Sequence, residues 1–354
     1  MRSLKLLLLI IAIALFVFSC DDDSKTEFTT TPYELRIPAG LPQPVIPDDN
    51  RLTVEGVNLG KELFFDKILS RDNTQSCASC HNQSFAFTDN LRDFSIGING
   101  DKGSRNSMAL FNLFYHNNGF FWDGRAATLR EQSLMPIEDP LEMDSDLDEV
   151  VQKLNSTSKY PRLFNEAFGS SEITSEKMAL AMEQYMFTLV SGNSKFDRVQ
   201  AGLEEFTELE ARGHSLFFEE SKPEIFLVGA DCFHCHSGPN FTNDEYINNG
   251  LDSEFTDKGY YETTGNTADI GKFKVPSLRN IAVSGPYMHD GRFRTLEEVV
   301  RHYNSGVKES PTLDPNVKSS RVGLQLSDED VEAVVAFLRT LTDDEFLNNP
   351  EYQR

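Results

Sequence analysis

Two short segments of the chain combine residue types that attach an iron cofactor. Each has the pattern C-x-x-C-H: Cys77, Cys80 and His81 form the first copy, and Cys232, Cys235 and His236 form the second. Cysteines at positions i and i+3 lie on one side of a helical turn, so both thiols reach the two vinyl groups of one porphyrin. The next residue, a histidine, then presents its imidazole to the iron. This spacing is typical of covalent haem c attachment.

Other sites built from paired cysteines explain the pattern less well. A zinc site could use both C-x-x-C pairs, and a thioredoxin-like redox motif uses one such pair, but neither needs a histidine directly after each pair. The fifth cysteine, Cys20, ends a hydrophobic N-terminal segment, so none is left for a structural disulfide. We therefore expect two haem c groups, with His81 and His236 as ligands of the two irons.

The N-terminus has the features of an export signal. A short basic segment precedes residues 6–18, which carry no charge and form a run too short to span a bilayer. The run ends in "VFSC", which is similar to a bacterial lipobox. We predict a lipoprotein signal peptide over residues 1–19, lipidation of Cys20 and a tether over residues 20–50.

The alternative to a cleaved signal is an uncleaved anchor helix. Either way the folded body lies outside the cytoplasm, in the cell envelope, as a periplasm-facing or outer-membrane lipoprotein. The chain is acidic, with 56 Asp and Glu against 33 Lys and Arg. This excess argues against nucleic acid as a partner and favours a basic protein partner, although it also serves solubility.

The sequence around the two motifs is repeated as well. "NLGKELFFD" (58–66) precedes the first motif and "EARGHSLFFEE" (210–220) precedes the second. Each is predicted to be a helix that ends in Leu-Phe-Phe. This duplication predicts a mostly α fold of two tandem domains, each similar to a small class I cytochrome c with one covalent haem c. We place the N-terminal domain over residues 51–195 and the C-terminal domain over residues 196–354.

Further helices are expected where apolar residues recur at helical spacing. They cover residues 175–191, 295–304 and 327–342, and Thr295 and Ser327 are the expected N-caps of the last two. In the first of them, a stripe of three methionines is expected to pack in the core rather than to bind iron: Met178, Met182 and Met186.

Long segments outside the cysteine motifs resemble the bacterial di-haem cytochrome c peroxidase and MauG family. They are "SFAFTDNLRDFSIGINGDKGSRNSMALFN", "FFWDGRAATLREQSLMPIEDPLEM" and "FKVPSLRNIAVSGPYMHDGRFRTLEEVVRHYN". The resemblance runs from about residue 51 to residue 340. It implies a peroxidatic haem in the first domain and an electron-transfer haem in the second.

The resemblance also implies roles for single residues. Glu142 matches the family's distal glutamate, which moves a proton between the two peroxide oxygens, and Gln132 matches the glutamine beside it. Trp122, the only tryptophan, matches the tryptophan that couples the two haems. Asp123 and Arg125 are expected to fix haem propionates and the local geometry.

A calcium ion between the domains is implied as well. Its expected ligands are Asn106, Ser284 and Pro286, since calcium prefers oxygen donors, including backbone carbonyls.

Two positions depart from the pattern of many peroxidases. A histidine that blocks the first iron in those enzymes is replaced by Ile98, and His116 lies at a different place. We therefore predict a first haem that is five-coordinate or water-bound and needs no reductive activation.

The second departure concerns the electron-transfer haem. Tyr303 stands where the standard peroxidases have an axial methionine, which is the MauG pattern. Met288 and His302 compete with Tyr303 as ligands of the second iron. His289 is expected to contact a propionate, and His234 to lie at the surface.

Three functions follow from the resemblance. The first is a peroxidase that reduces hydrogen peroxide to water with electrons from a small cytochrome c or cupredoxin. The second is a MauG-like oxidase that modifies a protein residue. The third is a di-haem electron carrier without enzymatic activity, against which Glu142 argues. The resemblance leaves open whether the chain is a monomer or a homodimer.

Overall fold

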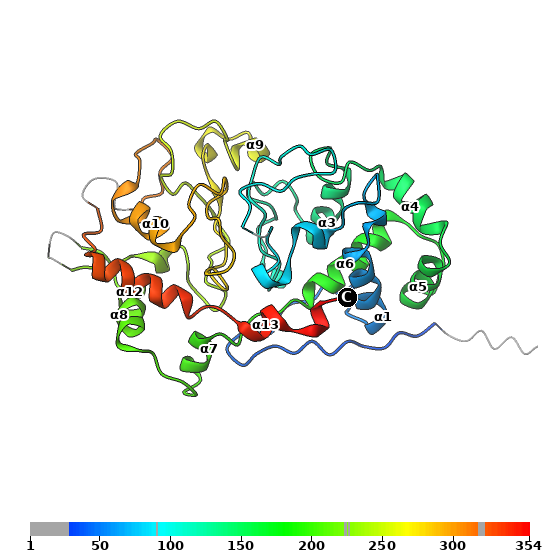
Figure 1. Ribbon diagram of the computed structural model, residues 1–354, viewed down its shortest axis with the longest axis horizontal. Coiled ribbons are helices and arrows are strands. Elements are labelled where there is room, and N and C mark those ends of the chain that lie inside the picture. Colours follow the sequence, from blue (N-terminus) through cyan, green and yellow to red (C-terminus); the bar gives the residue numbers. More distant parts are fainter. Residues whose placement is uncertain (1–27, 90, 223–224, 226, 318–322) are drawn as a thin grey trace, which may run out of the picture.

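The computed structural model describes residues 28–89, 91–222, 225, 227–317 and 323–354. The chain folds into two lobes that lie side by side, each with one C-x-x-C-H motif (Figure 1). The fold is mostly helical, as expected. No helix within these residues is long and apolar enough to cross a membrane. The predicted signal peptide and Cys20 lie outside the described residues.

The helices of the two lobes follow one another along the chain. The first lobe has α1 (Val54–Phe65), α2 (Cys77–Cys80), α3 (Leu129–Glu138), α4 (Leu147–Asn155), α5 (Lys159–Phe168) and α6 (Ser175–Phe187). The second lobe has α7 (Lys195–Gln200), α8 (Glu208–Phe218), α9 (Tyr261–Thr264), α10 (Leu296–Arg301) and α12 (Asp328–Arg339), and α13 (Asp344–Asn348) ends the series.

Regular structure outside the α-helices is short. Two strands, β1 (Tyr246–Ile247) and β2 (Phe273–Lys274), pair antiparallel. A π-helix, η7 (His302–Gly306), extends α10. The 3₁₀ turns are η1 (Lys67–Leu69), η2 (Gln83–Phe85), η3 (Leu113–Tyr115), η5 (Cys232–His234), η6 (Thr267–Asp269) and η8 (Pro350–Tyr352).

The predicted N-caps of α10 and α12 are confirmed. The side chain of Thr295 accepts a hydrogen bond from the N–H of Glu298, and the side chain of Ser327 accepts one from Asp330. In both caps the acidic side chain bonds back to the cap residue, which satisfies free N–H groups of the first turn.

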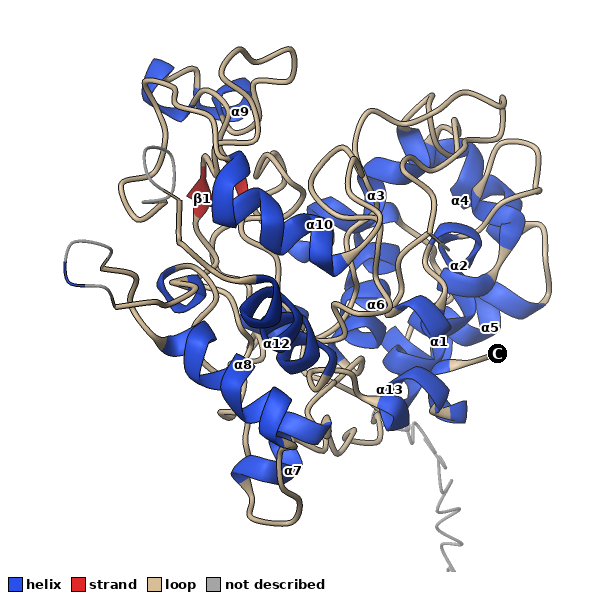
Figure 2. Ribbon diagram, turned by 60° about the vertical axis from the view of Figure 1, so that its left-hand side comes forward, coloured by secondary structure: helices blue, strands red, loops and turns tan. Residues whose placement is uncertain are grey.

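The same helix crossing occurs in both lobes. α1 packs against α6 in the first lobe and α8 against α12 in the second, where the pair lies side by side (Figure 2). Gly60 faces the carbonyl of Ala181, and Gly213 faces the carbonyl of Ala333. A Cβ atom at either glycine would clash with that carbonyl, so close approach of the two helices requires glycine. The crossing supports the inferred duplication of one cytochrome c-like unit.

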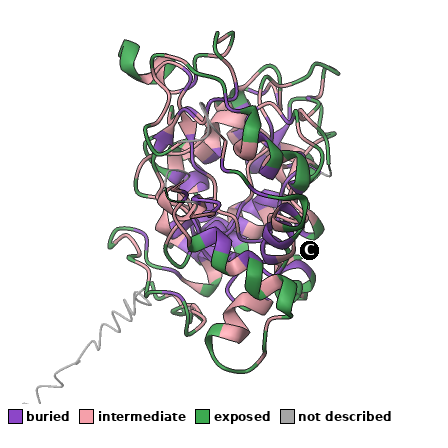
Figure 3. Cartoon of the chain, turned by 90° about the vertical axis from the view of Figure 1, so that its left-hand side faces the viewer, coloured by how far each residue is buried: buried purple, intermediate pink, exposed green. Residues whose placement is uncertain are grey.

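Each lobe has its own apolar core. Buried segments lie inside the molecule and exposed ones around it (Figure 3). Leu63 and Phe64, from the repeated Leu-Phe-Phe sequence, are buried in the first core, and Leu216 and Phe217 are buried in the second. Met178, Met182 and Met186 are fully buried in the first core, as expected.

The end of the chain returns to the first lobe. α13 leaves the second lobe and lies beside α1 (Figure 1). The ring of Phe346 lies 5.8 Å from those of Phe87 and Phe111, and Gln83 donates hydrogen bonds to the carbonyls of Phe346 and Asn349. Residues after 343 therefore belong to the first core, although the expected C-terminal domain ran to residue 354.

The segment before α1 differs from a free tether. Tyr33, Leu35, Ile37 and Ile46 pack against the first core, and Leu41 is buried. The expectation of a tether over residues 20–50 is wrong for residues 33–46, because the apolar residues between the prolines pack on the lobe. Contacts with the lobe already include Thr31, whose N–H donates to the carboxylate of Glu55 at 2.9 Å and whose carbonyl accepts from the N–H of Val54 at 2.8 Å.

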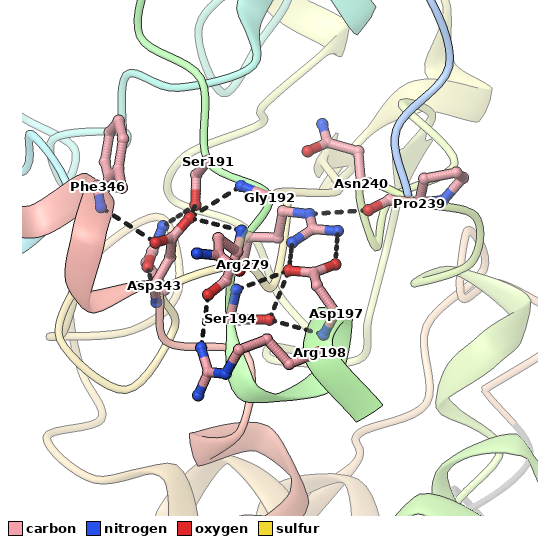
Figure 4. Close-up of polar contacts among 12 residues, drawn as sticks. Ser191, Gly192, Ser194, Asp197, Arg198, Pro239, Asn240, Arg279, Asp343 and Phe346 are labelled. Carbon is pink, nitrogen blue, oxygen red and sulfur yellow. Dashed lines mark hydrogen bonds and ion pairs between the residues drawn. The ribbon is translucent and has the colours of Figure 1, made fainter. Parts of the chain in front are cut away.

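A buried polar network holds the lobes together (Figure 4). The carboxylate of Asp343 accepts hydrogen bonds from the Ser191 hydroxyl (3.1 Å) and from the backbone N–H groups of Gly192, Asn193 and Phe346 (2.9–3.0 Å). The segment 191–193, which links the lobes, is thereby fixed to the start of α13. Nearby, Arg279 and Asp197 form a bidentate ion pair at 2.8 Å.

Candidate haem sites

The first C-x-x-C-H motif forms one wall of a cavity. Ser76 and Ser79 form a capping box that starts α2, so the two thiols lie on one helical turn. His81 ends this turn, and its N–H donates to the carbonyl of Cys77 at 2.9 Å. The cavity encloses about 580 Å³, and its wall includes Cys77, Cys80, His81, Leu110, Gln132, Pro136, Glu142, Met143, Met182 and Met186.

The imidazole of His81 is oriented by a backbone carbonyl. Its Nδ1 atom lies 2.6 Å from the oxygen of Phe87. A carbonyl only accepts, so Nδ1 carries the proton and Nε2 keeps a free lone pair. Burial lowers the pKa of His81, so the ring is neutral. A neutral imidazole with a free Nε2 is the form that binds a metal.

Glu142 and Gln132 face the same cavity as His81. Gln132 projects from α3, and Glu142 lies in the turn after it, where its N–H donates to the carbonyl of Asp139. Burial, with a smaller contribution from Asp139, raises the pKa of Glu142 to about 7, and the nearby charge of Arg125 opposes this shift. The structure thus brings together the predicted iron ligand and a carboxyl group whose pKa lies near neutral pH.

The loop at residues 95–98 lies against Glu142. Ile98 donates its N–H to the carbonyl of Glu142 at 2.9 Å, and a Cβ atom at Gly97 would clash with the carbonyl of Leu141. Ser95, Ile96 and Gly97 line the cavity. Among the described residues of the cavity wall, His81 is the only histidine. His116 lies elsewhere, with Nδ1 2.7 Å from Asp244.

The second motif lines a larger cavity of about 1380 Å³. The Nδ1 atom of His236 lies 3.2 Å from the carbonyl oxygen of Phe241, the same arrangement as in the first site. Burial lowers the pKa of His236 to about 4, so this ring is neutral too. Apolar side chains of α10, α12 and the 275–281 segment complete the wall, among them Val275, Leu278, Leu296, Val300, Val334 and Leu338.

Two of the three candidate ligands of the second iron line this cavity. They are Tyr303, from the π-helix η7, and Met288. Burial raises the pKa of Tyr303 to about 12, and a hydrogen bond from Asn249 opposes this shift. His302 is turned away, because its Nε2 atom lies 3.3 Å from the carbonyl of Asn249 and the residue is absent from the cavity wall.

Trp122 lies where the lobes meet. It lines the second cavity, and its Nε1 atom donates to the carbonyl of Asn106 at 2.8 Å. Lys274 of β2 donates its backbone N–H to the carbonyl of Trp122 at 2.9 Å. The indole is therefore bonded to the first lobe, and the backbone of the same residue is bonded to the second lobe. Asp123, next in the chain, is buried and forms ion pairs with Arg105 and with Arg125.

The other predicted residues have defined surroundings. The ring of His289 stacks on Phe273 at 3.6 Å and lines the second cavity. His234 is half-buried rather than at the surface, and it lies 3.0 Å from the carboxylate of Asp231.

The calcium site stays a prediction. The backbone carbonyl of Asn106 accepts a hydrogen bond from Trp122. Its side-chain amide donates hydrogen bonds to the backbone carbonyls of Arg92 and Asp93. No group of three or more His, Cys, Asp or Glu side chains placed to hold a metal ion occurs in the described part of the chain.

Both cavities suit the group that the sequence predicts. Each presents two thiols at helical spacing and a histidine with a free Nε2, surrounded by apolar side chains. These are the donors and the environment of haem c. The sequence analysis did not find Phe87, Phe241 or Asn249, because a backbone carbonyl or a lone asparagine leaves no motif. A phenylalanine follows each motif histidine at a similar distance, six residues after His81 and five after His236, and this is the one signal present in the sequence.

Comparisons with known proteins agree with these sites. Residues 54–205 match the family model of di-haem cytochrome c peroxidase, and residues 211–342 match that of cytochrome c. Methylamine utilization protein MauG of Methylorubrum extorquens is 37% identical over 323 residues, which cover 90% of this chain and 86% of that protein. Cytochrome c551 peroxidase of Nitrosomonas europaea is 35% identical over 292 residues, which cover 81% and 80%.

Two solved structures are also similar. A MauG-like protein associated with microbial copper homeostasis has a TM-score of 0.80 at 32% identity, covering 91% of this chain and 99% of that one. The diheme peroxidase BthA from Burkholderia thailandensis has a TM-score of 0.73 at 26% identity, covering 84% and 88%.

Proposed function

Because this chain belongs to the di-haem cytochrome c peroxidase and MauG family, we propose that it reduces hydrogen peroxide to water with electrons from a small redox protein. The chain is an oxidoreductase with two haem c groups. Cys77, Cys80 and His81 would hold the first, and Cys232, Cys235 and His236 the second. The donor would be a small cytochrome c or a cupredoxin, and the acidic surface favours a basic one.

The observation that carries this proposal is the position of Glu142. When bound, haem c supplies an iron that takes up peroxide and exchanges electrons. Glu142 would take a proton from one peroxide oxygen and return it to the other, which needs a carboxyl group with a pKa near the working pH. Its pKa of about 7 meets this requirement. Gln132, which lines the same cavity, would orient the peroxide.

The experiment that tests this function measures turnover with a donor. Reduced cytochrome c is mixed with the holoprotein and hydrogen peroxide, and oxidation of the donor is followed by its absorbance. Continuous oxidation that depends on both peroxide and the holoprotein supports a peroxidase. Absence of turnover with basic and acidic cytochromes and with a cupredoxin would contradict it.

A MauG-like oxidase that modifies a protein residue is the second candidate. Tyr303 favours it, since this tyrosine lines the second cavity at the position expected for a MauG-type ligand. A phenolate ligand lowers the potential relative to methionine. Peroxide added without a donor separates the two functions: a long-lived oxidised spectrum with poor oxidation of cytochrome c would favour the oxidase.

The location of the protein is part of the proposal. The hydrophobic run and the cysteine of "VFSC" would place the mature chain outside the cytoplasm, attached to a membrane by a lipid at Cys20. Haem c attachment fits such an exported protein. The proposal also includes a calcium ion bound by Asn106, Ser284 and Pro286. A homodimer of two chains is its last part.

A further inference from the structure

We propose that Asn249 is a positioning residue that selects Tyr303 over Met288 as axial ligand of the second haem iron. The inference rests on the proposed function in one respect, which is that the second cavity holds a haem. Asn249 contacts all three side chains that the sequence analysis gives as candidate ligands of the second iron. Its amide contacts Tyr303 and Met288, and its backbone carbonyl contacts His302.

The amide of Asn249 has two N–H groups, and both are used. Nδ2 lies 3.1 Å from the phenol oxygen of Tyr303 and 3.5 Å from the sulfur of Met288. A hydrogen bond to an anionic oxygen is stronger than one to a neutral oxygen. The first contact therefore favours the phenolate, which is the form of tyrosine that binds ferric iron.

The contact with Met288 has the opposite effect on that side chain. A thioether sulfur is a weak acceptor with two lone pairs, and the amide N–H engages one of them. The same amide group thus supports the phenol oxygen and holds the sulfur toward Asn249. No rearrangement of the backbone is needed for the choice between them, since both side chains already line the cavity.

The backbone carbonyl of Asn249 removes the third candidate. A carbonyl only accepts, so Nε2 of His302 carries the proton in this contact. The other ring nitrogen faces the backbone of Gly306, where an added Cβ atom would lie 3.2 Å from Nδ1. The Nε2 atom is thus engaged outside the second cavity, and His302 is absent from its described wall.

Asn249 is held in place by its neighbours. Asn248 is buried, and its amide donates to the hydroxyls of Ser310 and Thr312 at 2.9 Å each. The carbonyl of Gly250 accepts a hydrogen bond from the N–H of Lys308 at 2.7 Å. Because the segment around Asn249 is held by these hydrogen bonds, the side-chain amide of Asn249 has a fixed orientation. A positioning role requires such a fixed donor.

The test replaces the amide and reads out the ligand. Asn249→Leu keeps a similar volume without donors, and Asn249→Asp is the isosteric second variant should the leucine protein fail to fold. Ferric holoproteins are compared by magnetic circular dichroism and by the far-red sulfur-to-iron charge-transfer band that marks methionine ligation. The reduction potential of the second haem is measured by titration. Met288→Leu is the matched control, and Tyr303→Phe calibrates loss of the phenolate.

We expect Asn249→Leu to show the sulfur band and a raised potential, and Met288→Leu to match the wild type. In the double variant with Met288→Leu the band should vanish and the potential should fall below the wild-type value, because the phenolate then binds without its hydrogen bond. The proposal would be overturned if the single variant Asn249→Leu kept the wild-type spectrum and reduction potential. It would also be overturned by a raised potential that persists in the double variant, or by a Tyr303→Phe protein with an unchanged spectrum.

These readouts do not depend on turnover. A protein without peroxidase activity that still shows the changes at Asn249 would contradict the proposed function and support this inference. A protein that has peroxidase activity but shows none of these changes in the Asn249 variants would contradict only the inference.

Discussion

Nδ1 of His81 lies 2.6 Å from the carbonyl oxygen of Phe87, and this contact leaves Nε2 free for the cavity that the ring lines. The second lobe repeats the contact between His236 and Phe241. The two sites therefore hold the predicted ligand histidines alike and differ in other residues of the cavity wall. Glu142 lines the first cavity and Tyr303 the second, and in the proposed function this difference underlies the division of roles between the two haems.

Each cysteine pair should hold one haem independently. Replacing Cys232 and Cys235 by alanine removes both thioether bonds of the second site and leaves the first motif intact. We expect mass spectrometry of the denatured protein to find a single covalent haem in this variant and two in the wild type. The reciprocal variant, without Cys77 and Cys80, is the control. Two covalent haems in either variant would contradict the assignment.

Loss of the carboxyl group at Glu142 should slow the reaction with peroxide. Glu142→Gln keeps the size of the side chain but removes the acid–base group, and such groups contribute about 10²-fold or more. The second-order rate constant, measured by stopped-flow absorbance, should fall by at least that factor. Glu138→Gln, at the exposed end of α3, is the matched control and should react as the wild type does. An unchanged rate in Glu142→Gln would exclude Glu142 from the mechanism.

The reaction should depend on pH through the same residue. Burial raises the pKa of Glu142 to about 7, so its carboxylate is the minor form below pH 7 and the major form above it. A general base acts in its deprotonated form. The rate constant for peroxide should therefore rise through about pH 7 and level off at higher pH. The same inflection in Glu142→Gln would assign it to another group.

The polar network around Asp343 should contribute to the stability of the whole molecule. Asp343→Ala removes a buried carboxylate and leaves the Ser191 hydroxyl and the N–H groups of Gly192, Asn193 and Phe346 without this acceptor. Such a loss costs about 2–4 kcal/mol. Denaturant unfolding of the holoprotein should show a free energy of unfolding lower by that amount. Asp344→Ala, at the exposed neighbouring position, should change it by less than about 0.5 kcal/mol.

The sequence was sufficient for the parts of the fold that depend on local patterns. Capping residues and apolar spacing predict α10 and α12, whose N-caps are Thr295 and Ser327. The two haem motifs and the repeated helices that end in Leu-Phe-Phe are also recognised from local patterns. Glu142 and Gln132 were placed in one site by resemblance alone, and the structure brings both to the cavity that His81 lines.

The rest depends on contacts between residues far apart in the chain. Phe346, which follows the second lobe in the chain, packs against Phe87 in the core of the first lobe, and no periodic pattern records that contact. The direction of the His302 ring depends on the carbonyl of Asn249, which any residue would supply. Such long-range pairs are set by the packing of the lobes and leave no local signal.

The most direct test of the account uses the diferric holoprotein as isolated, without a reductant. Because no histidine other than His81 lines the described wall of the first cavity, the first haem should already be open to peroxide. Stopped-flow mixing should show a spectral change whose rate increases linearly with peroxide concentration and is not accelerated by prior reduction of the second haem. Two low-spin haems that respond to peroxide only after reduction would contradict it.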